Sequence, residues 1–224
     1  HNNAWPVPAD PKSPRRGAPA DERIEPAELY ERLRALAPNV LIQLNHPRAD
    51  SVGTIGLGYF SNFDFQPALV IPESSDGGIN GFLRRRSPSG QTDNLGFDAM
   101  EILNGSSFAA VFDGLQNRAD WFALLRQGIL RTGMANSDSH TVAPEAAGFP
   151  RTYVRYASAA FEVTTLNEAI LQMRVVGSNG PFIEAKILGP TEAQVGDTFV
   201  RAEAGTVELA IKVQAAPWIP VESM

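Results

Sequence analysis

The order of hydrophobic and polar residues predicts alternating helices and strands along the first three quarters of the chain. Leucines at helical spacing follow Pro26, which suits a first helical turn, and they stop before Pro38, which ends a helix. The apolar run 39–44 then predicts a buried strand. By the same reasoning we expect strands at 98–103, 129–135 and 151–156, and helices at 165–175 and at 117–127 with Asn117 as its cap. Alternation of this kind favours a parallel α/β architecture.

Two stretches lack a regular period. Residues 6–26 hold several prolines, which remove hydrogen-bond donors, so an irregular surface connection is expected there. Residues 50–96 are rich in Gly, Ser, Asn and Phe, and a segment of that length is typical of a lid or binding wall, or is partly disordered. We expect a short strand at 68–71 inside it. The arginine run 84–86 is interpreted as a solvated face, with anion binding as the less favoured alternative.

The last part of the chain follows a different pattern. Residues 181–187 and 206–213 alternate between apolar and polar, which is the period of half-buried antiparallel strands. No helical pattern separates them, so we predict the beginning of an antiparallel β-sandwich that is incomplete within this sequence. The predicted domains are residues 1–178, the α/β part, and residues 179–224, the start of the sandwich.

Polar residues stand directly after three of the predicted strands. They are Asn45-His46, Asn104-Gly105 and Asp138-Ser139-His140. The carboxyl ends of strands are where an α/β barrel builds its active site. If the extended run before Asp138 is a strand that continues, Asp138 and His140 point to the same side and form a metal-ligand pair or an acid–base pair.

Each candidate residue also has an ordinary structural interpretation. Asp138 and His140 fit a polar turn, since Ser, Asn and Asp favour turns. His46 fits a capping residue in a turn, and Glu101 fits a structural carboxylate or an outward-facing strand residue. His1 fits a disordered terminus.

Composition excludes several classes of function. The chain has 224 residues, of which 43% are hydrophobic, so it can bury a sizeable core. Its net charge of −6 argues against nucleic acid as the main partner, and no apolar run is long enough to span a membrane. Cysteine is absent, which excludes disulfides, thiolate ligands and a cysteine nucleophile and leaves the compartment open, with a periplasmic or secreted location among the options. The glycine signatures of serine hydrolases, phosphate-binding loops and dinucleotide folds are also missing.

Several of these motifs together resemble the PHP (polymerase and histidinol phosphatase) superfamily, and within it the CehA/McbA-like metallohydrolases. The resemblance covers most of the chain. The motifs that carry it are Asn45-His46-Pro47-Arg48, the run 98–105, Trp121 with Leu124, Leu125 and Gly128, the run 133–140, the run 150–154 and Asn179-Gly180-Pro181-Phe182.

The resemblance implies the C-terminal part of a distorted (β/α)7 barrel, with two or three divalent metal ions at the carboxyl ends of its strands. His1, His46, Asp138 and His140 match metal ligands of that family. Glu101 and Asn104 are expected to support the ligands without binding metal. Imidazole and carboxylate ligands suit Zn, Mn or Fe. Arg48, beside a ligand histidine, is expected to hold an anionic group of the substrate.

The implied activity is hydrolysis by a metal-activated water, on phosphate esters first. The alternatives are a carbamate, ester or amide hydrolase of the CehA/McbA type and a degenerate, non-enzymatic binding module. The substrate is expected to be a small molecule. The family's opening His-x-His, a further Asp and His and a bridging Glu have no counterpart here, so the N-terminal half of the barrel is expected elsewhere and this chain alone is expected to be incompetent. His46 and His140 are expected to lie close together.

Overall fold

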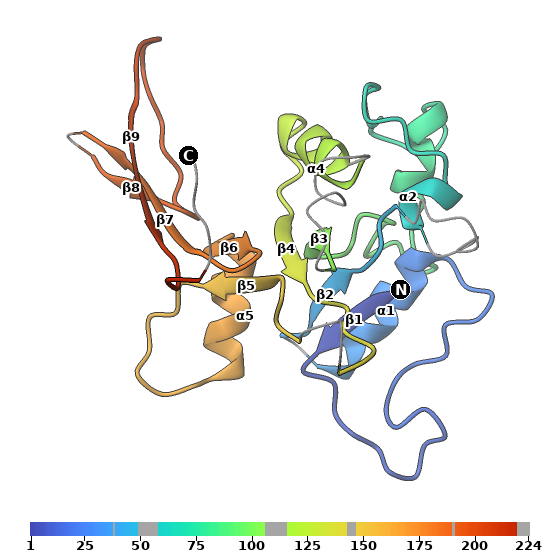
Figure 1. The fold of residues 1–224 in the computed structure, drawn as a ribbon. Coiled ribbons are helices and arrows are strands. Elements are labelled where there is room, and N and C mark those ends of the chain that lie inside the picture. Colours follow the sequence, from blue (N-terminus) through green and yellow to red (C-terminus); the bar gives the residue numbers. More distant parts are fainter. Residues whose placement is uncertain (38, 49–57, 106–115, 143–146, 190, 219–224) are drawn as a thin grey trace. The chain divides into compact units, whose positions relative to one another are not determined.

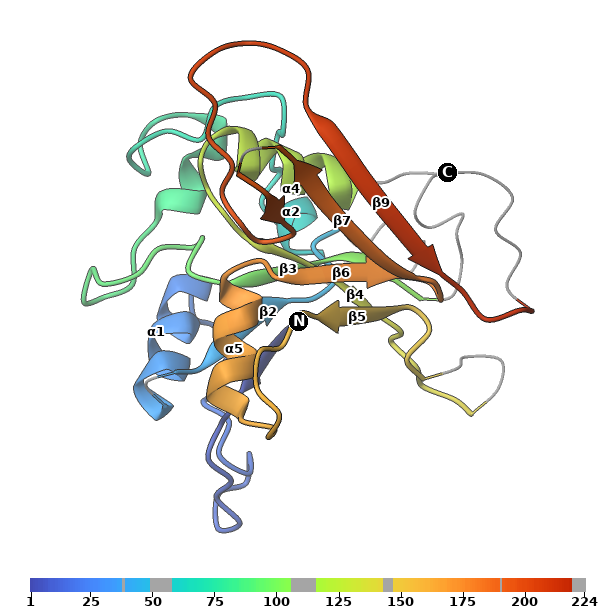
Figure 2. The same cartoon turned by 90° about the vertical axis from the view of Figure 1, so that its left-hand side faces the viewer.

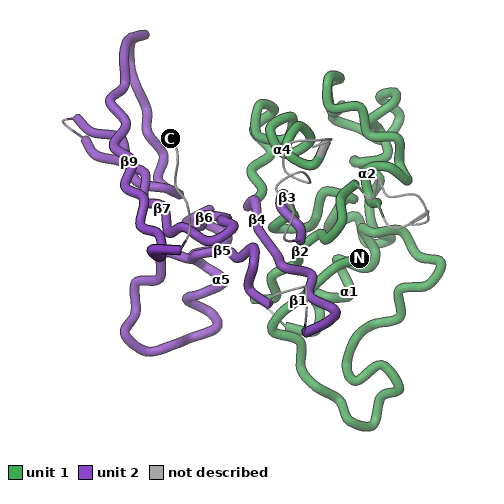
Figure 3. Tube along the Cα trace, in the orientation of Figure 1, with its two compact units in different colours: residues 1–101, 116–131 green, residues 102–115, 132–224 purple. Residues whose placement is uncertain are grey.

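The computed structural model describes residues 1–37, 39–48, 58–105, 116–142, 147–189 and 191–218 (Figure 1). It is a mixed α/β protein that forms two compact units (Figure 3). Unit 1 comprises residues 1–101 and 116–131, and unit 2 comprises residues 102–115 and 132–224. Strand β3, Ala99–Asn104, begins in unit 1 and ends in unit 2. The predicted boundary between residues 178 and 179 stays a prediction.

Unit 1 contains a short sheet in which β2, Leu41–Leu44, lies between β1, Asn2–Trp5, and β3. All four residues of β2 are buried, as the apolar run predicted. β2 and β3 run parallel, with Leu44 opposite Met100, which agrees with the predicted parallel arrangement. β1 runs antiparallel to β2 and was not predicted, because Asn2–Trp5 shows no strand period.

The described part of unit 1 contains four helical segments. Helix α1, Pro26–Leu36, begins at the predicted proline and buries Ala27, Tyr30 and Leu33. The others are α2, Tyr59–Asn62, the 3-10 helix η1, Ile79–Arg84, and α4, Gln116–Arg126. Asn117 lies inside α4 and not at its cap, so that part of the prediction is wrong.

The segment 50–96, interpreted as a lid or wall, supplies much of the core of unit 1 in its described part. Phe60, Phe65 and Leu83 are fully buried, and Phe60 and Tyr59 pack edge-to-face against Phe97. The buried side chain of Asn94 accepts the Ala27 N–H at 2.9 Å and thereby caps α1. Residues 50–57 lie outside the described residues, and the lid role stays a prediction.

The strand predicted at 68–71 does not form. Asn80 is buried and its side chain takes the hydrogen bonds that a neighbouring strand would provide. Its Oδ1 accepts the Gln66 N–H at 3.0 Å, and its Nδ2 donates to the carbonyl oxygens of Gln66 at 3.0 Å and Leu69 at 3.2 Å. These bonds hold the backbone here in a turn. Of the arginines at 84–86, Arg84 pairs with Asp93 at 3.2 Å, Arg85 pairs with the distant Glu25 at 3.3 Å, and Arg86 donates to the Gly90 carbonyl at 2.8 Å.

Within its described residues, unit 2 continues with short strands and a helix. They are β4, Thr132–Asn136, β5, Arg151–Val154, α5, Val163–Leu171, β6, Val175–Ser178, β7, Phe182–Leu188, β8, Ala193–Gln194, and β9, Glu208–Gln214. β5 and β6 pair antiparallel. β6 approaches β4 closely: a side chain at Gly177 would meet the Ala135 Cβ at 2.9 Å, so this position requires glycine.

The helix predicted at 165–175 extends too far at its C-terminal end. α5 ends at Leu171, and a turn follows in which Met173 takes a left-handed conformation (φ 58°) and Arg174 N–H donates to the Ala169 carbonyl at 3.0 Å. Val175 then begins β6. The apolar residues 175 and 176 continue the helical period by accident, and pairing with β5 decides their conformation.

The alternating runs near the end form the predicted antiparallel strands, which Figure 2 shows side by side as β7 and β9. Ala185 stands opposite Ile211 on one face. On the other face Lys212 Nζ lies 3.2 Å from Glu184 Oε2. β7 lies between β8 and β9 in a three-stranded sheet. The described strands do not close into a barrel, and a complete sandwich is not formed by them. No helix within the described ranges is long and apolar enough to cross a membrane.

The aromatic cluster gives a stability prediction. Phe97 is 1% exposed and contacts the rings of Tyr30, Tyr59 and Phe60. We expect Phe97→Ala to lower the free energy of unfolding by about 3–5 kcal/mol, because it leaves a cavity among rigid rings. Phe122→Ala, at a position that is 44% exposed, is expected to cost about 1 kcal/mol or less. Urea denaturation of both variants makes the comparison, and equal losses would contradict it.

Candidate functional site

His46 follows the buried strand β2 and takes a left-handed backbone conformation, with φ 47°. Its backbone N–H donates to Glu101 Oε2 at 2.9 Å, and its ring atom Nδ1 lies 3.3 Å from the same oxygen. A left-handed conformation is uncommon for residues with side chains and is found repeatedly at functional sites. The contact with Glu101 therefore holds both the backbone and the ring of His46.

The parallel pairing of β2 and β3 explains this contact. Leu44 lies opposite Met100, so His46 and Glu101 come to the same edge of the sheet. Glu101 is only 2% exposed, and a buried carboxylate needs hydrogen-bond donors. With Nδ1 facing the carboxylate, the neutral imidazole keeps its proton on Nδ1 and its lone pair on Nε2. Metal-binding histidines are commonly oriented by a carboxylate in this way.

His1 reaches the same place from the antiparallel strand. β1 begins where β2 ends, and the Asn45 N–H donates to the His1 carbonyl at 3.0 Å. The rings of His1 and His46 meet edge-to-face with their centroids 5.5 Å apart. Unit 1 thus brings together His1, His46 and Glu101, all three singled out from the sequence.

Arg48 lies in a buried ion pair. Its Nε and Nη2 donate to the two carboxylate oxygens of Asp120 at 2.7 and 3.0 Å, and Nη2 also donates to the Phe65 carbonyl at 2.6 Å. The side chain of Arg48 is 10% exposed and that of Asp120 is 0% exposed. The Arg48 N–H donates to Asn117 Oδ1 at 3.0 Å. The substrate role of Arg48 stays a prediction, and these contacts give it a structural one.

Asp138 and His140 form the second pair, in unit 2. The Asp138 carbonyl oxygen lies 2.7 Å from His140 Nδ1, and His140 Nε2 lies 3.9 Å from Asp138 Oδ1. A proton on Nδ1, donated to the carbonyl, leaves the lone pair on Nε2 facing the carboxylate. The sequence predicted that these two side chains converge, and they do.

The cause of that convergence differs from the expected one. β4 ends at Asn136, and Asp138 takes a left-handed conformation with φ 47°. The two side chains therefore meet through a turn and not through the two-residue alternation of a strand. Ser139 Oγ donates to the Thr141 carbonyl at 3.2 Å, as expected in a polar turn. His140 is 71% exposed, so this pair is open to solvent.

Asn104 is the last residue of β3, and the next residue, Gly105, donates its N–H to the Asn136 carbonyl at 3.1 Å. The ends of β3 and β4 are thereby connected within unit 2. The supporting role predicted for Asn104 stays a prediction.

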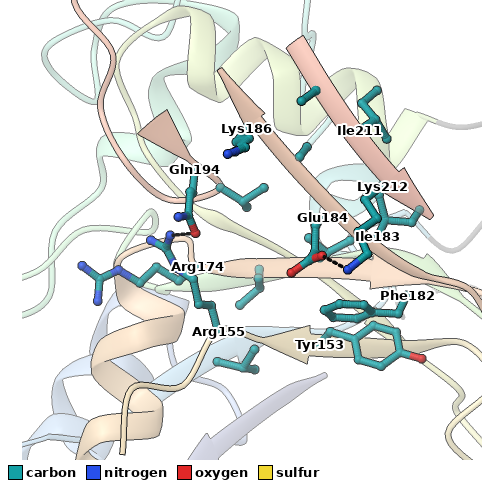
Figure 4. Close-up of a pocket in the computed structure, with 16 residues that line it drawn as sticks. Tyr153, Arg155, Arg174, Phe182, Ile183, Glu184, Lys186, Gln194, Ile211 and Lys212 are labelled. Atoms are coloured by element: carbon teal, nitrogen blue, oxygen red, sulfur yellow. Dashed lines mark hydrogen bonds and ion pairs between the residues drawn. The ribbon is translucent and has the colours of Figure 1, made fainter. Parts of the chain in front are cut away.

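A cavity of about 460 Å³ lies in unit 2 and contains none of the predicted site residues (Figure 4). Its walls are mainly apolar, with Phe182 packed edge-to-face on Tyr153, and the Glu184–Lys212 and Arg155–Gln194 contacts line it. It lies between the pair β5–β6 and the sheet of β7, β8 and β9.

The donors present fit a divalent metal in type. Each pair joins an imidazole to a carboxylate, the combination that suits Zn, Mn or Fe. The 3.9 Å between His140 Nε2 and Asp138 Oδ1 is slightly more than the roughly 3.3 Å expected of two ligands on one tetrahedral ion. No group of three or more His, Asp or Glu side chains able to hold an ion is found among the described residues. Further ligands are therefore needed to complete either pair.

The sequence reasoning missed Asp120, and it missed the contact of Asn117 with Arg48. Asp120 and Asn117 stand three positions apart on α4, but Arg48, which they bind, is 72 and 69 positions away. Only the spacing of two polar residues on one helix face marked them, and that spacing is common on solvated helices.

A comparison with protein-family models, with curated proteins and with solved structures gave no match in any of the three. The resemblance to the PHP superfamily rests on the motifs quoted above.

Glu101 provides a test of this geometry. We expect Glu101→Ala to lower the free energy of unfolding by about 1–3 kcal/mol, because the His46 N–H loses its acceptor. Glu101→Gln keeps an acceptor oxygen and is expected to cost less. Urea denaturation measures both. Glu73→Ala, at an exposed position of the same unit, is the control and should match the wild type. An equal loss in the Ala and Gln variants would show that charge, and not the N–H contact, dominates.

Proposed function

We propose that this protein is a metal-dependent hydrolase that uses a metal-activated water, with phosphate esters as the preferred substrate class. One observation carries the proposal: two histidines that follow strands each have one ring nitrogen facing an oxygen of the protein. For His46 this oxygen belongs to Glu101, and for His140 it is the carbonyl of Asp138. In both rings we propose Nε2 as the metal-binding nitrogen, because the other nitrogen faces the orienting oxygen.

The proposed ligands are His1, His46, Asp138 and His140, with Glu101 orienting His46. Two or three ions of Zn, Mn or Fe are proposed, in a distorted (β/α)7 barrel whose other strands complete the ligand set. A bound divalent ion lowers the pKa of its water and polarises the phosphoryl or carbonyl oxygen of the substrate. The protein's own part is to present these side chains where the substrate approaches.

The local conformations support this assignment of roles. His46 and Asp138 are both left-handed at φ 47°, an arrangement that surrounding contacts must maintain. At His46 the maintaining contact is the buried Glu101 carboxylate. At Asp138 its own carbonyl fixes the His140 ring.

Two alternatives remain as proposals. Carbamate, ester or amide hydrolysis follows from the CehA/McbA-like part of the resemblance and uses the same ligands. A non-enzymatic binding module is the other alternative, and it is compatible with the 71% exposure of His140. Metal analysis separates the module from both hydrolases, because a degenerate site should bind no stoichiometric metal.

The first experiment is metal analysis of the full-length protein, with the strands proposed to complete the ligand set, followed by assays with p-nitrophenyl phosphate, p-nitrophenyl acetate and an aryl carbamate. We expect at least one tightly bound divalent ion and the highest kcat/KM for the phosphate ester. A higher value for the ester or carbamate would select that alternative. Absence of both metal and turnover would leave the binding module.

The second prediction concerns the ligands. We expect His46→Ala and Asp138→Asn each to reduce kcat/KM by at least about 100-fold, because a hydrolytic ion needs its ligands at once. Bound metal should fall in parallel while the melting temperature changes little. Asp197→Asn, which breaks an exposed ion pair with Arg155 in unit 2, is the matched control and should keep activity. Wild-type kcat/KM in either ligand variant, after metal removal and readdition, would contradict the assignment.

A further inference from the structure

Each residue from 45 to 48 makes a hydrogen bond through its backbone. Asn45 N–H donates to the His1 carbonyl, and His46 N–H donates to Glu101. The Pro47 carbonyl accepts the Phe60 N–H at 2.8 Å, and Arg48 N–H donates to Asn117 Oδ1. Four consecutive residues thus have fixed backbone partners, and the left-handed residue stands among them.

The strongest of these attachments is the side chain of Arg48. Its planar guanidinium meets both oxygens of Asp120, a two-point contact that fixes orientation as well as distance. The third bond, to the Phe65 carbonyl, and the Phe60 and Phe65 rings at about 6 Å from the guanidinium carbon leave it little freedom. Asp120 belongs to α4, so the pair attaches the segment after β2 to this helix.

A buried ion pair of this kind is a weak source of stability. Removing two charges from water costs as much as their attraction returns, and apolar replacements are often equally stable. What such a pair supplies is one defined geometry. Arg48 is two residues after His46, so the geometry that it defines is that of the proposed ligand.

We propose that Asp120 is a positioning residue for His46, acting through Arg48. This inference rests on the proposed function, because positioning matters most if His46 binds metal. Without the Asp120 carboxylate, Arg48 becomes a buried cation with one fewer partner and leaves its place. The segment 45–48 then relaxes from the left-handed conformation at His46, and the ring loses its fixed orientation against Glu101.

The test uses two readouts on Asp120→Asn and Arg48→Lys. The first is the ¹⁵N chemical shifts of the His46 ring in metal-free protein, which report which nitrogen carries the proton. The wild type should show protonated Nδ1 and unprotonated Nε2. Both variants should shift toward an average of the two forms. The second readout is the affinity for Zn²⁺ by chelator competition, which should fall about 10–100-fold.

The control is Asp93→Asn, which disrupts the half-buried Arg84–Asp93 pair in the same unit. It should lose stability without changing the His46 signals or Zn²⁺ affinity. If Asp120→Asn does not fold, Arg48→Lys, which keeps the positive charge but loses the two-point contact, decides the question.

The outcomes are distinguishable. Wild-type ring signals in the variants would overturn the positioning role, whatever the metal affinity. Altered ring signals in a protein that binds no Zn²⁺ even as wild type would uphold the positioning role and overturn the proposed metal site. A change equally large in Asp93→Asn would show that general loosening of unit 1, and not the Arg48–Asp120 contact, controls the ring.

Discussion

The geometry of unit 1 near its candidate ligands depends on one buried carboxylate. Glu101 is 2% exposed, and a charge removed from water must be surrounded by donors. The parallel register of β2 and β3 presents the N–H and ring of His46 to it. That requirement maintains a left-handed histidine at the end of a strand whose four residues are all buried. The hydrophobic strand and the polar edge are two consequences of the same pairing, since the ladder that buries β2 also delivers His46 to Glu101.

Sequence periodicity predicted the elements whose conformation is decided locally. The helix at Pro26–Leu36 and the strand at Leu41–Leu44 have clear patterns and clear ends. The segments whose conformation was predicted wrongly or not at all take that conformation from partners distant in the sequence. Asn2–Trp5 has no strand period and is a strand only because it pairs with β2. Residues 68–71 look extended by composition, but the Asn80 side chain takes their hydrogen bonds. Val175 continues a helical pattern and is removed from the helix by pairing with β5. Periodicity reports which faces are apolar and cannot report which long-range partner is available.

The same division applies to the candidate site. Position after a strand was sufficient to select His46, Asp138 and His140, because the carboxyl ends of strands gather polar groups. It was insufficient for the mode of convergence at Asp138, which depends on a left-handed turn. It was also insufficient for Asp120, whose partner Arg48 is 72 positions away in the sequence. Because Arg48 stands beside a predicted ligand histidine, its guanidinium was predicted to bind an anionic group of the substrate. The structure provides an anion from within the protein, which the sequence had no means of ranking against a substrate.

Both histidine–carboxylate pairs orient an imidazole ring, but the two pairs differ in rigidity. At His46 the orienting oxygen is a buried side chain, held by a sheet and reinforced by the contacts of Arg48. At His140 it is a neighbouring backbone carbonyl in an exposed turn. A ligand that is already ordered loses little conformational entropy when it binds, whereas an exposed side chain must give up rotamer freedom. The pair at His46 therefore contributes a fixed point to the proposed site, and the pair at Asp138 and His140 contributes adaptability. Groups that are already fixed need no reorganisation when charge develops in a reaction, so the ordered pair at His46 is the better suited of the two to that task in the proposed site.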